Sequence, residues 1–115
     1  MELYHEYIKE REGLALYTNE HGFVSYRCTG HECYIADIFI KKESRGTPAL
    51  FDLIKELEKI AIVNGCSHLS GVIRANDPGI NRTMKAALKL GFNILAIQNN
   101  GVVITKELKG DMWAE

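Results

Sequence analysis

The chain has 115 residues, with 14 basic and 15 acidic side chains and a net charge of −1. This length suffices for a single domain with a hydrophobic core, and we interpret residues 1–115 as one domain in which residues 109–115 form a tail. The near-zero charge gives no electrostatic case for nucleic acid or membrane as a partner, and no apolar run is long enough to span a bilayer. Three cysteines without framework spacing, and an N-terminus without a signal-peptide layout, predict a cytoplasmic protein.

Strands and helices alternate along the predicted chain. Apolar periodicity and turn residues predict strands at 14–18, 23–29, 34–40, 68–74, 92–98 and 102–108, and helices at 2–12, 48–63 and 81–90. Because a right-handed crossover joins residues 34–40 to residues 68–74, these two strands are expected to be parallel neighbours. The order predicts an α/β (α+β) fold, with a mixed, mostly antiparallel sheet, a central parallel pair and helices on both faces.

The stretch from Tyr34 to Val63 organises this arrangement. Its strand, YIADIFI, is apolar except for one acid, Asp37, which suits a strand covered on both faces. In the following helix Thr47 can act as N-cap and Pro48 fits the first helical position. One face of the helix is apolar, and the charged residues of the other face are expected in water: Asp52, Lys55, Glu56, Glu58 and Lys59.

A strand, a charged turn and a helix start form a predicted anion site. The first turn of a helix leaves backbone N–H groups unpaired at the positive end of the helix dipole, which suits phosphate. Arg45 stands directly before Gly46 at this helix start and favours the phosphate interpretation. The alternative for Arg45 is a charged turn that is merely solvated.

Two segments of the chain resemble motifs of a known family. IFIKKESRGTPALFDLIKEL resembles the central motif of the GNAT (N-acetyltransferase) superfamily, a strand, a turn with R-G-x-G-x-G/A and a helix. NRTMKAALKLGF resembles its second motif, a helix that ends on Leu-Gly-Phe. The resemblance covers residues 14–107 and implies a GNAT-like fold, acetyl-CoA as cosubstrate and direct attack by an amine of an unidentified acceptor.

The resemblance also implies where acetyl-CoA is held. Main-chain N–H groups of the central strand would contact the acetyl carbonyl, main-chain N–H groups of the turn would contact the pyrophosphate, and an Asn near the second motif would contact the cofactor. The corresponding positions are Phe39, Ile40, Arg45, Gly46, Thr47, Ala49, Asn76 and Asn81. For the two Asn residues the alternative is turn formation and helix capping.

The chain departs from the family pattern at the cofactor loop and near Leu-Gly-Phe. Pro48, which has no N–H, stands where the family has its first glycine of the loop, and Leu50 stands at the second Gly or Ala. Ala86 and Ala87 occupy the neighbourhood where many members carry a Tyr that protonates the departing thiolate. The alternative function is therefore a catalytically inactive GNAT-fold protein used for binding or assembly.

Two side chains are candidates for proton transfer. Asp37 is the best candidate base, because an acid in an apolar strand must face a cavity, a partner or water. His68, on the parallel strand, could relay a proton. The alternatives are that Asp37 pairs with a basic neighbour or faces the sheet edge and that His68 is a solvated surface group.

Cys28, His31 and Cys33 surround one hairpin turn, but their spacing matches no familiar zinc pattern, and we predict no metal site. The family's full form has more chain before its first strand than the 13 residues found here. We therefore expect a minimal form, or a homodimer in which each copy borrows a wall from the other.

Overall fold

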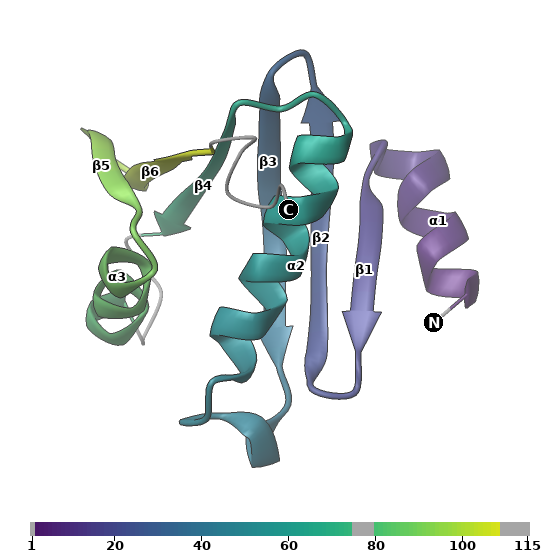
Figure 1. Cartoon of the computed structure of the whole chain (residues 1–115), viewed down its shortest axis with the longest axis horizontal. Coiled ribbons are helices and arrows are strands. Elements are labelled where there is room, and N and C mark those ends of the chain that lie inside the picture. The colour runs from purple at the N-terminus through teal and green to yellow at the C-terminus, as the bar shows by residue number, and fades with distance from the viewer. Residues whose placement is uncertain (1, 75–79, 109–115) are drawn as a thin grey trace, which may run out of the picture.

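The computed structural model describes residues 2–74 and 80–108, and within them the chain forms one sheet with helices packed against it (Figure 1). The strand order is β1-β2-β3-β4-β6-β5. The helices are α1 (Glu2–Glu12), α2 (Ala49–Val63) and α3 (Ile80–Lys89), with a short 3-10 helix at Lys42–Ser44. The strands are β1 (Ala15–Asn19), β2 (Gly22–Thr29), β3 (Glu32–Ile40), β4 (His68–Arg74), β5 (Asn93–Gln98) and β6 (Gly101–Glu107).

The predicted mixed sheet is confirmed. β3 and β4 are parallel, and the other neighbouring strands are antiparallel. The parallel pairing covers only Glu32–Tyr34 against His68–Ser70, although both strands continue beyond it. The two strands therefore diverge after Tyr34 and Ser70, leaving a gap at their carboxyl ends.

A bulge in β3 lies at the start of this gap. Ser25 pairs with Asp37 and Tyr26 pairs with Ile35, so Ala36 has no partner on β2. The extra residue reverses the alternation of side chains along the strand. Ile35 and Ile38 consequently pack against the same core cluster, whereas Ala36 joins the smaller cluster on the other face.

Helices cover both faces of the sheet, as predicted. Leu53, Ile54 and Leu57 of α2 are fully buried against one face, in the cluster that also holds Ala87 of α3. α1 lies beside β1 (Figure 1), and the ring of Tyr4 contacts Phe23 edge-on at 6.2 Å between centroids. Phe23 belongs to the opposite cluster, so α1 and α2 lie on different faces.

Two details of α2 differ from the sequence prediction. Glu58 is 1% exposed rather than in water, because Lys106 of β6 reaches it with a 2.6 Å ion pair. The helix begins at Ala49, with Pro48 in the N-cap position that was predicted for Thr47. The Thr47 hydroxyl still contributes, since it accepts a hydrogen bond from the Ala49 N–H at 3.2 Å.

None of the helices in residues 2–74 and 80–108 is long and apolar enough to cross a membrane.

Candidate functional site

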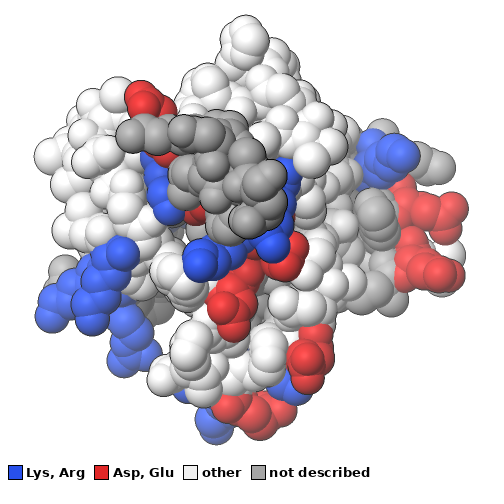
Figure 2. Space-filling model, viewed as in Figure 1, with Lys and Arg blue, Asp and Glu red and all other residues white. Residues whose placement is uncertain are grey.

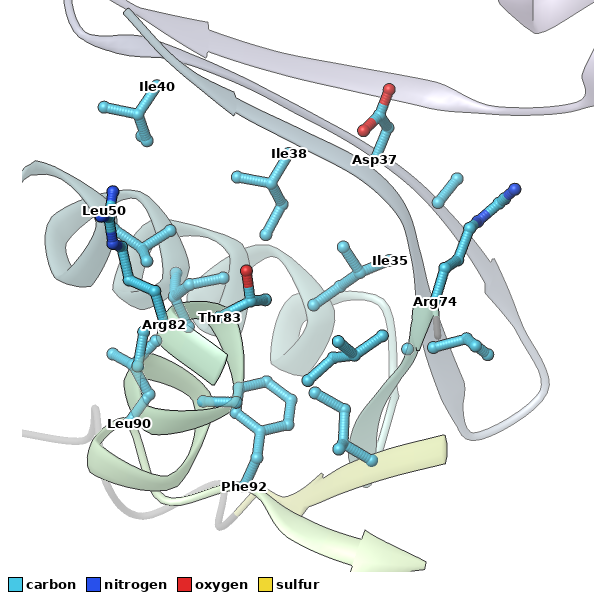
Figure 3. A pocket seen from close by; sticks show the side chains of 18 residues that line it. Ile35, Asp37, Ile38, Ile40, Leu50, Arg74, Arg82, Thr83, Leu90 and Phe92 are labelled. Carbon is cyan, nitrogen blue, oxygen red and sulfur yellow. The ribbon is translucent and has the colours of Figure 1, made fainter. Parts of the chain in front are cut away.

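A cavity of about 820 Å³ occupies the gap where β3 and β4 diverge. Its walls come from both strands and from α2 and α3, and Figure 3 shows Ile35 and Ile38 of β3 pointing into the space bordered by Thr83 and Phe92. The volume lies within the range of small-molecule pockets, and the lining is mainly apolar. The divergence of the parallel pair thus creates room for a ligand with an apolar part.

Leu50 lines this cavity without filling it. The side chain is half-buried in the first turn of α2 and forms one wall together with Ile54 and Leu90. Pro48, which precedes it, is exposed and does not belong to the lining. Neither Leu50 nor Pro48 therefore closes the cavity.

Charged groups lie at the rim of the cavity. Asp37 is exposed, and Figure 3 shows its carboxylate on the side of β3 opposite to Ile35 and Ile38. Arg74 at the end of β4 and Arg82 in the first turn of α3 are also exposed lining residues. Within residues 2–74 and 80–108 neither guanidinium forms an ion pair, so both can meet a negatively charged ligand.

In the turn that precedes α2, backbone N–H groups donate hydrogen bonds to acceptors within the same segment. The N–H of Arg45 donates to the Lys42 carbonyl at 3.3 Å, and the N–H of Thr47 donates to the Ser44 carbonyl at 3.3 Å. Since the Ala49 N–H donates to Thr47, three of the four amides predicted for the pyrophosphate already have acceptors.

The side chain of Arg45 also folds back onto the protein. Its Nε donates to the Ile40 carbonyl at 2.9 Å, and its guanidinium carbon lies 5.6 Å from the centre of the Phe39 ring. The amides of Leu50 and Phe51 come next in the helix and have no acceptor among the described residues. The donors that remain for an anion are therefore the Gly46 amide of the turn and the Leu50 and Phe51 amides at the start of α2.

The end of β3 presents alternate amides to the gap. The Phe39 carbonyl faces β2, because a Cβ atom built on Gly22 would lie 1.9 Å from its oxygen. Successive residues of a strand present their N–H and C=O groups to opposite edges. The Ile40 carbonyl accordingly meets Arg45 on the other edge, and the amides of Ile38 and Ile40 face the cavity.

The structure does not bring the two candidate proton-transfer residues together. His68 pairs with Glu32 at the closed end of the parallel strands and does not line the cavity. Asp37 lies about 16 Å further along the same strand pair, at the strand's usual rise per residue. Asn76 lies outside the described residues, and Asn81 lies in the first turn of α3 with its side chain outside the described part.

Sequence reasoning missed Arg74, Arg82 and Thr83 as lining residues. Arg82 could have been found, since it is the basic residue closest to the start of the helix that follows the second parallel strand. The sequence did not indicate Thr83 as a lining residue, because its direction toward the cavity depends on how α3 packs against β4. Among the described residues no group of three or more His, Cys, Asp or Glu side chains could hold a metal ion.

No protein-family model matches the sequence, and no curated protein matches it. Solved structures do match. The PaiA N-acetyltransferase of Thermoplasma acidophilum in complex with coenzyme A superposes with a TM-score of 0.67 at 16% identity, over 76% of this chain. A nourseothricin acetyltransferase gives 0.70 at 17% identity over 77% of this chain, and an aminoglycoside 6'-N-acetyltransferase complexed with coenzyme A gives 0.70 at 13% over 80%.

The chain has the GNAT fold. The predicted fold resemblance is thereby confirmed, and the parallel pair of the GNAT fold is the β3–β4 pair that borders the cavity. The chain spans 53% of the PaiA structure, 58% of the nourseothricin acetyltransferase and 70% of the aminoglycoside acetyltransferase.

Proposed function

We propose that this protein binds acetyl-CoA in the cavity between β3 and β4 and transfers the acetyl group to an amine of an acceptor. The observation that carries the proposal is the divergence of the parallel strands after Tyr34 and Ser70, which opens a cavity of about 820 Å³ beside the start of α2. Two of the solved structures with this fold hold coenzyme A, which supports the choice of ligand.

The apolar walls of the cavity bind one part of acetyl-CoA, and the charged rim binds another. The acetyl group and the adjoining thioester arm fit between Ile35, Ile38 and Leu50. The phosphates fit at the cavity mouth, where Arg82 supplies positive charge and the helix start of α2 supplies its dipole and the amides of Leu50 and Phe51. This assignment moves the phosphate contacts from the predicted amides of Arg45, Thr47 and Ala49 to groups that have no acceptor among the described residues.

The chemistry requires little from the side chains. The acceptor nitrogen attacks the thioester carbonyl carbon, and the amides of Ile38 and Ile40 donate to the carbonyl oxygen as it becomes negative. Asp37 accepts the proton that the ammonium group loses, directly or through water. The carbon–sulfur bond then breaks, and the CoA thiolate departs. A thiolate is a good enough leaving group to depart without an acid in place of Ala86.

Release of free CoA thiol from acetyl-CoA, measured with a panel of primary amines, tests this proposal. The Asp37→Asn variant should lower kcat by at least about tenfold and leave acetyl-CoA affinity unchanged, as expected for a general base. Asp52→Asn, on the exposed face of α2, is the matched control and should leave kcat unchanged. Unchanged turnover in Asp37→Asn would remove Asp37 from the mechanism.

A second candidate is a catalytically inactive protein that binds CoA through the same cavity. The observation that favours it is the turn before α2, in which the amides of Arg45, Thr47 and Ala49 bond within the protein. The thiol-release assay together with a titration of acetyl-CoA separates the two candidates: saturable binding without release of thiol for any amine would establish the inactive binder.

A cytoplasmic location and homodimerisation remain part of the proposal. Ile94, Leu95 and Ile97 are exposed on β5, the edge strand next to β6, and would supply an apolar surface for a second copy. Sedimentation equilibrium at micromolar concentration should then give about twice the chain mass of 13.0 kDa. A mass of one chain would contradict the dimer.

A further inference from the structure

The three cysteines of the chain converge in one place, although they come from three separate segments. Cys28 lies on β2, Cys33 on β3 and Cys66 in the turn between α2 and β4. All three are free thiols; Cys28 is half-buried and the other two are buried. The thiol of Cys28 is central, because both Cys33 and Cys66 form side-chain hydrogen bonds with it.

Strand register brings two of these thiols into position for a bond. Cys28 and Cys33 are direct cross-strand partners, one pair away from the Thr29–Glu32 pair that closes the hairpin. Residues directly opposite on antiparallel strands have Cα atoms about 4.5 or 5.5 Å apart, and disulfides need about 4.4–6.8 Å. Both side chains also join the same core cluster and hence the same face.

We propose that Cys28 and Cys33 form a cross-strand disulfide when a hydroperoxide oxidises the protein, which makes this thiol cluster a modification site. The site lies at the closed end of the β3–β4 pair, where Cys33 faces Leu69, and it is separate from the cavity lining. It therefore stands independently of the proposed acetyl transfer.

The reaction runs in two balanced steps. The Cys28 sulfur attacks one oxygen of hydrogen peroxide, the O–O bond breaks, and one water leaves as Cys28 becomes a sulfenic acid. The Cys33 sulfur then attacks the Cys28 sulfur, the S–O bond breaks, and a second water leaves with the proton of Cys33. Two thiols are oxidised by two electrons, and one peroxide is reduced to two waters.

The order of the two steps follows from burial. Burial raises the pKa of Cys33 and of Cys66, and the neighbouring Cys28 raises both further. The two buried thiols are therefore protonated at neutral pH and poor first nucleophiles. Cys28 is the more accessible thiol and therefore reacts first.

Peptide mapping of the oxidised full chain distinguishes the possible bridges. Trypsin leaves Cys28 and Cys33 together in peptide 28–41 and places Cys66 in peptide 60–74. After treatment with hydrogen peroxide and alkylation of the remaining thiols, peptide 28–41 should appear intact without alkylation, and Cys66 should be alkylated. Cleavage after Glu32 should then yield two fragments that separate only on reduction.

Variants keep the proposal falsifiable. Cys66→Ala should still lose both of its thiols on oxidation, whereas Cys28→Ser, at a half-buried position, should retain both of its own. Cys33→Ala serves as a second test if circular dichroism shows that it folds. A bridge from peptide 28–41 to peptide 60–74, a bridge in Cys28→Ser, or three alkylated thiols in oxidised wild-type protein would each overturn the proposal.

Discussion

The buried carboxylate of Glu58 links α2 to β6. Glu58 is 1% exposed, and Lys106 of β6 donates to its Oε2 at 2.6 Å. A buried charge without a partner is strongly unfavourable, because the protein interior solvates it poorly. The Lys59–Glu56 pair on the same helix is half-exposed and 3.7 Å long, and water screens it.

Replacing Lys106 should therefore lower the free energy of unfolding far more than replacing Lys59. We expect Lys106→Met to lower the free energy of unfolding by about 3–5 kcal/mol, as for other broken buried pairs. Lys59→Met should lower it by less than about 1 kcal/mol. Urea denaturation of the two variants measures the difference, and equal losses would contradict the role assigned to the buried pair.

Because of the Cys66 thiol, we expect the free energy of unfolding to fall at alkaline pH. Burial, followed by a hydrogen bond to Cys28, raises its pKa from 9.0 to about 11. Between these values the unfolded chain has released a proton that the folded chain still holds, so the free energy of unfolding falls as the pH rises from 9 towards 11. Denaturation across this range should show a smaller decline in Cys66→Ala, and an identical decline would contradict the effect of burial.

Among the elements, the β2–β3 hairpin fixes the geometry of the site. β3 carries the bulge at Ala36, and its far end approaches β2 so closely at Gly22 that a Cβ atom there would lie 1.9 Å from the Phe39 carbonyl oxygen. At Gly71, on β4, an added Cβ would meet only ordinary contacts with Ile35 at 3.8 Å. A side chain is therefore excluded at Gly22 by the backbone of β3, whereas Gly71 has room for a methyl group.

Gly22→Ala should consequently destabilise the protein by at least about 2 kcal/mol, because the backbone of β2 must move away from β3. Gly71→Ala should change the free energy of unfolding by less than about 1 kcal/mol, since no atom must move. Thermal and urea unfolding of both variants provide the comparison. A Gly22→Ala protein as stable as wild type would show that the hairpin is less tightly paired than described.

The sequence predicted the elements well, because their signals are local. Apolar alternation, the long stripe of α2 and turn residues such as Gly101 do not depend on distant contacts. The parallel pairing of β3 and β4 was also predictable, since a right-handed crossover joins the two strands. The predicted fold therefore agrees with the structure.

The finer features of the site depend on contacts between distant residues. Glu58 is buried because Lys106 arrives from β6, almost fifty residues later. The amides of Arg45, Thr47 and Ala49 are occupied by hydrogen bonds to Lys42, Ser44 and Thr47, which a helix-start pattern does not reveal. The place of Arg82 at the cavity mouth depends on how α3 packs.

At the scale of the whole molecule, charge is distributed unevenly despite a net charge of −1. Figure 2 shows basic side chains gathered at one side, over α3, whereas acidic and basic side chains mix elsewhere on this face. The sequence of α3, INRTMKAALK, contains three basic residues and no acidic one. This local positive charge lies beside the cavity mouth and favours an anionic ligand.

Isothermal titration of acetyl-CoA tests the central claim, that the gap between β3 and β4 is the binding site. Gly71→Leu places a bulky side chain in the cavity wall, and Gly71→Ala adds one methyl group as the matched control. We predict one site in wild-type protein, a loss of at least about tenfold in affinity for Gly71→Leu and less than about threefold for Gly71→Ala. Absence of binding to wild-type protein, or equal affinity in folded Gly71→Leu, would contradict the account.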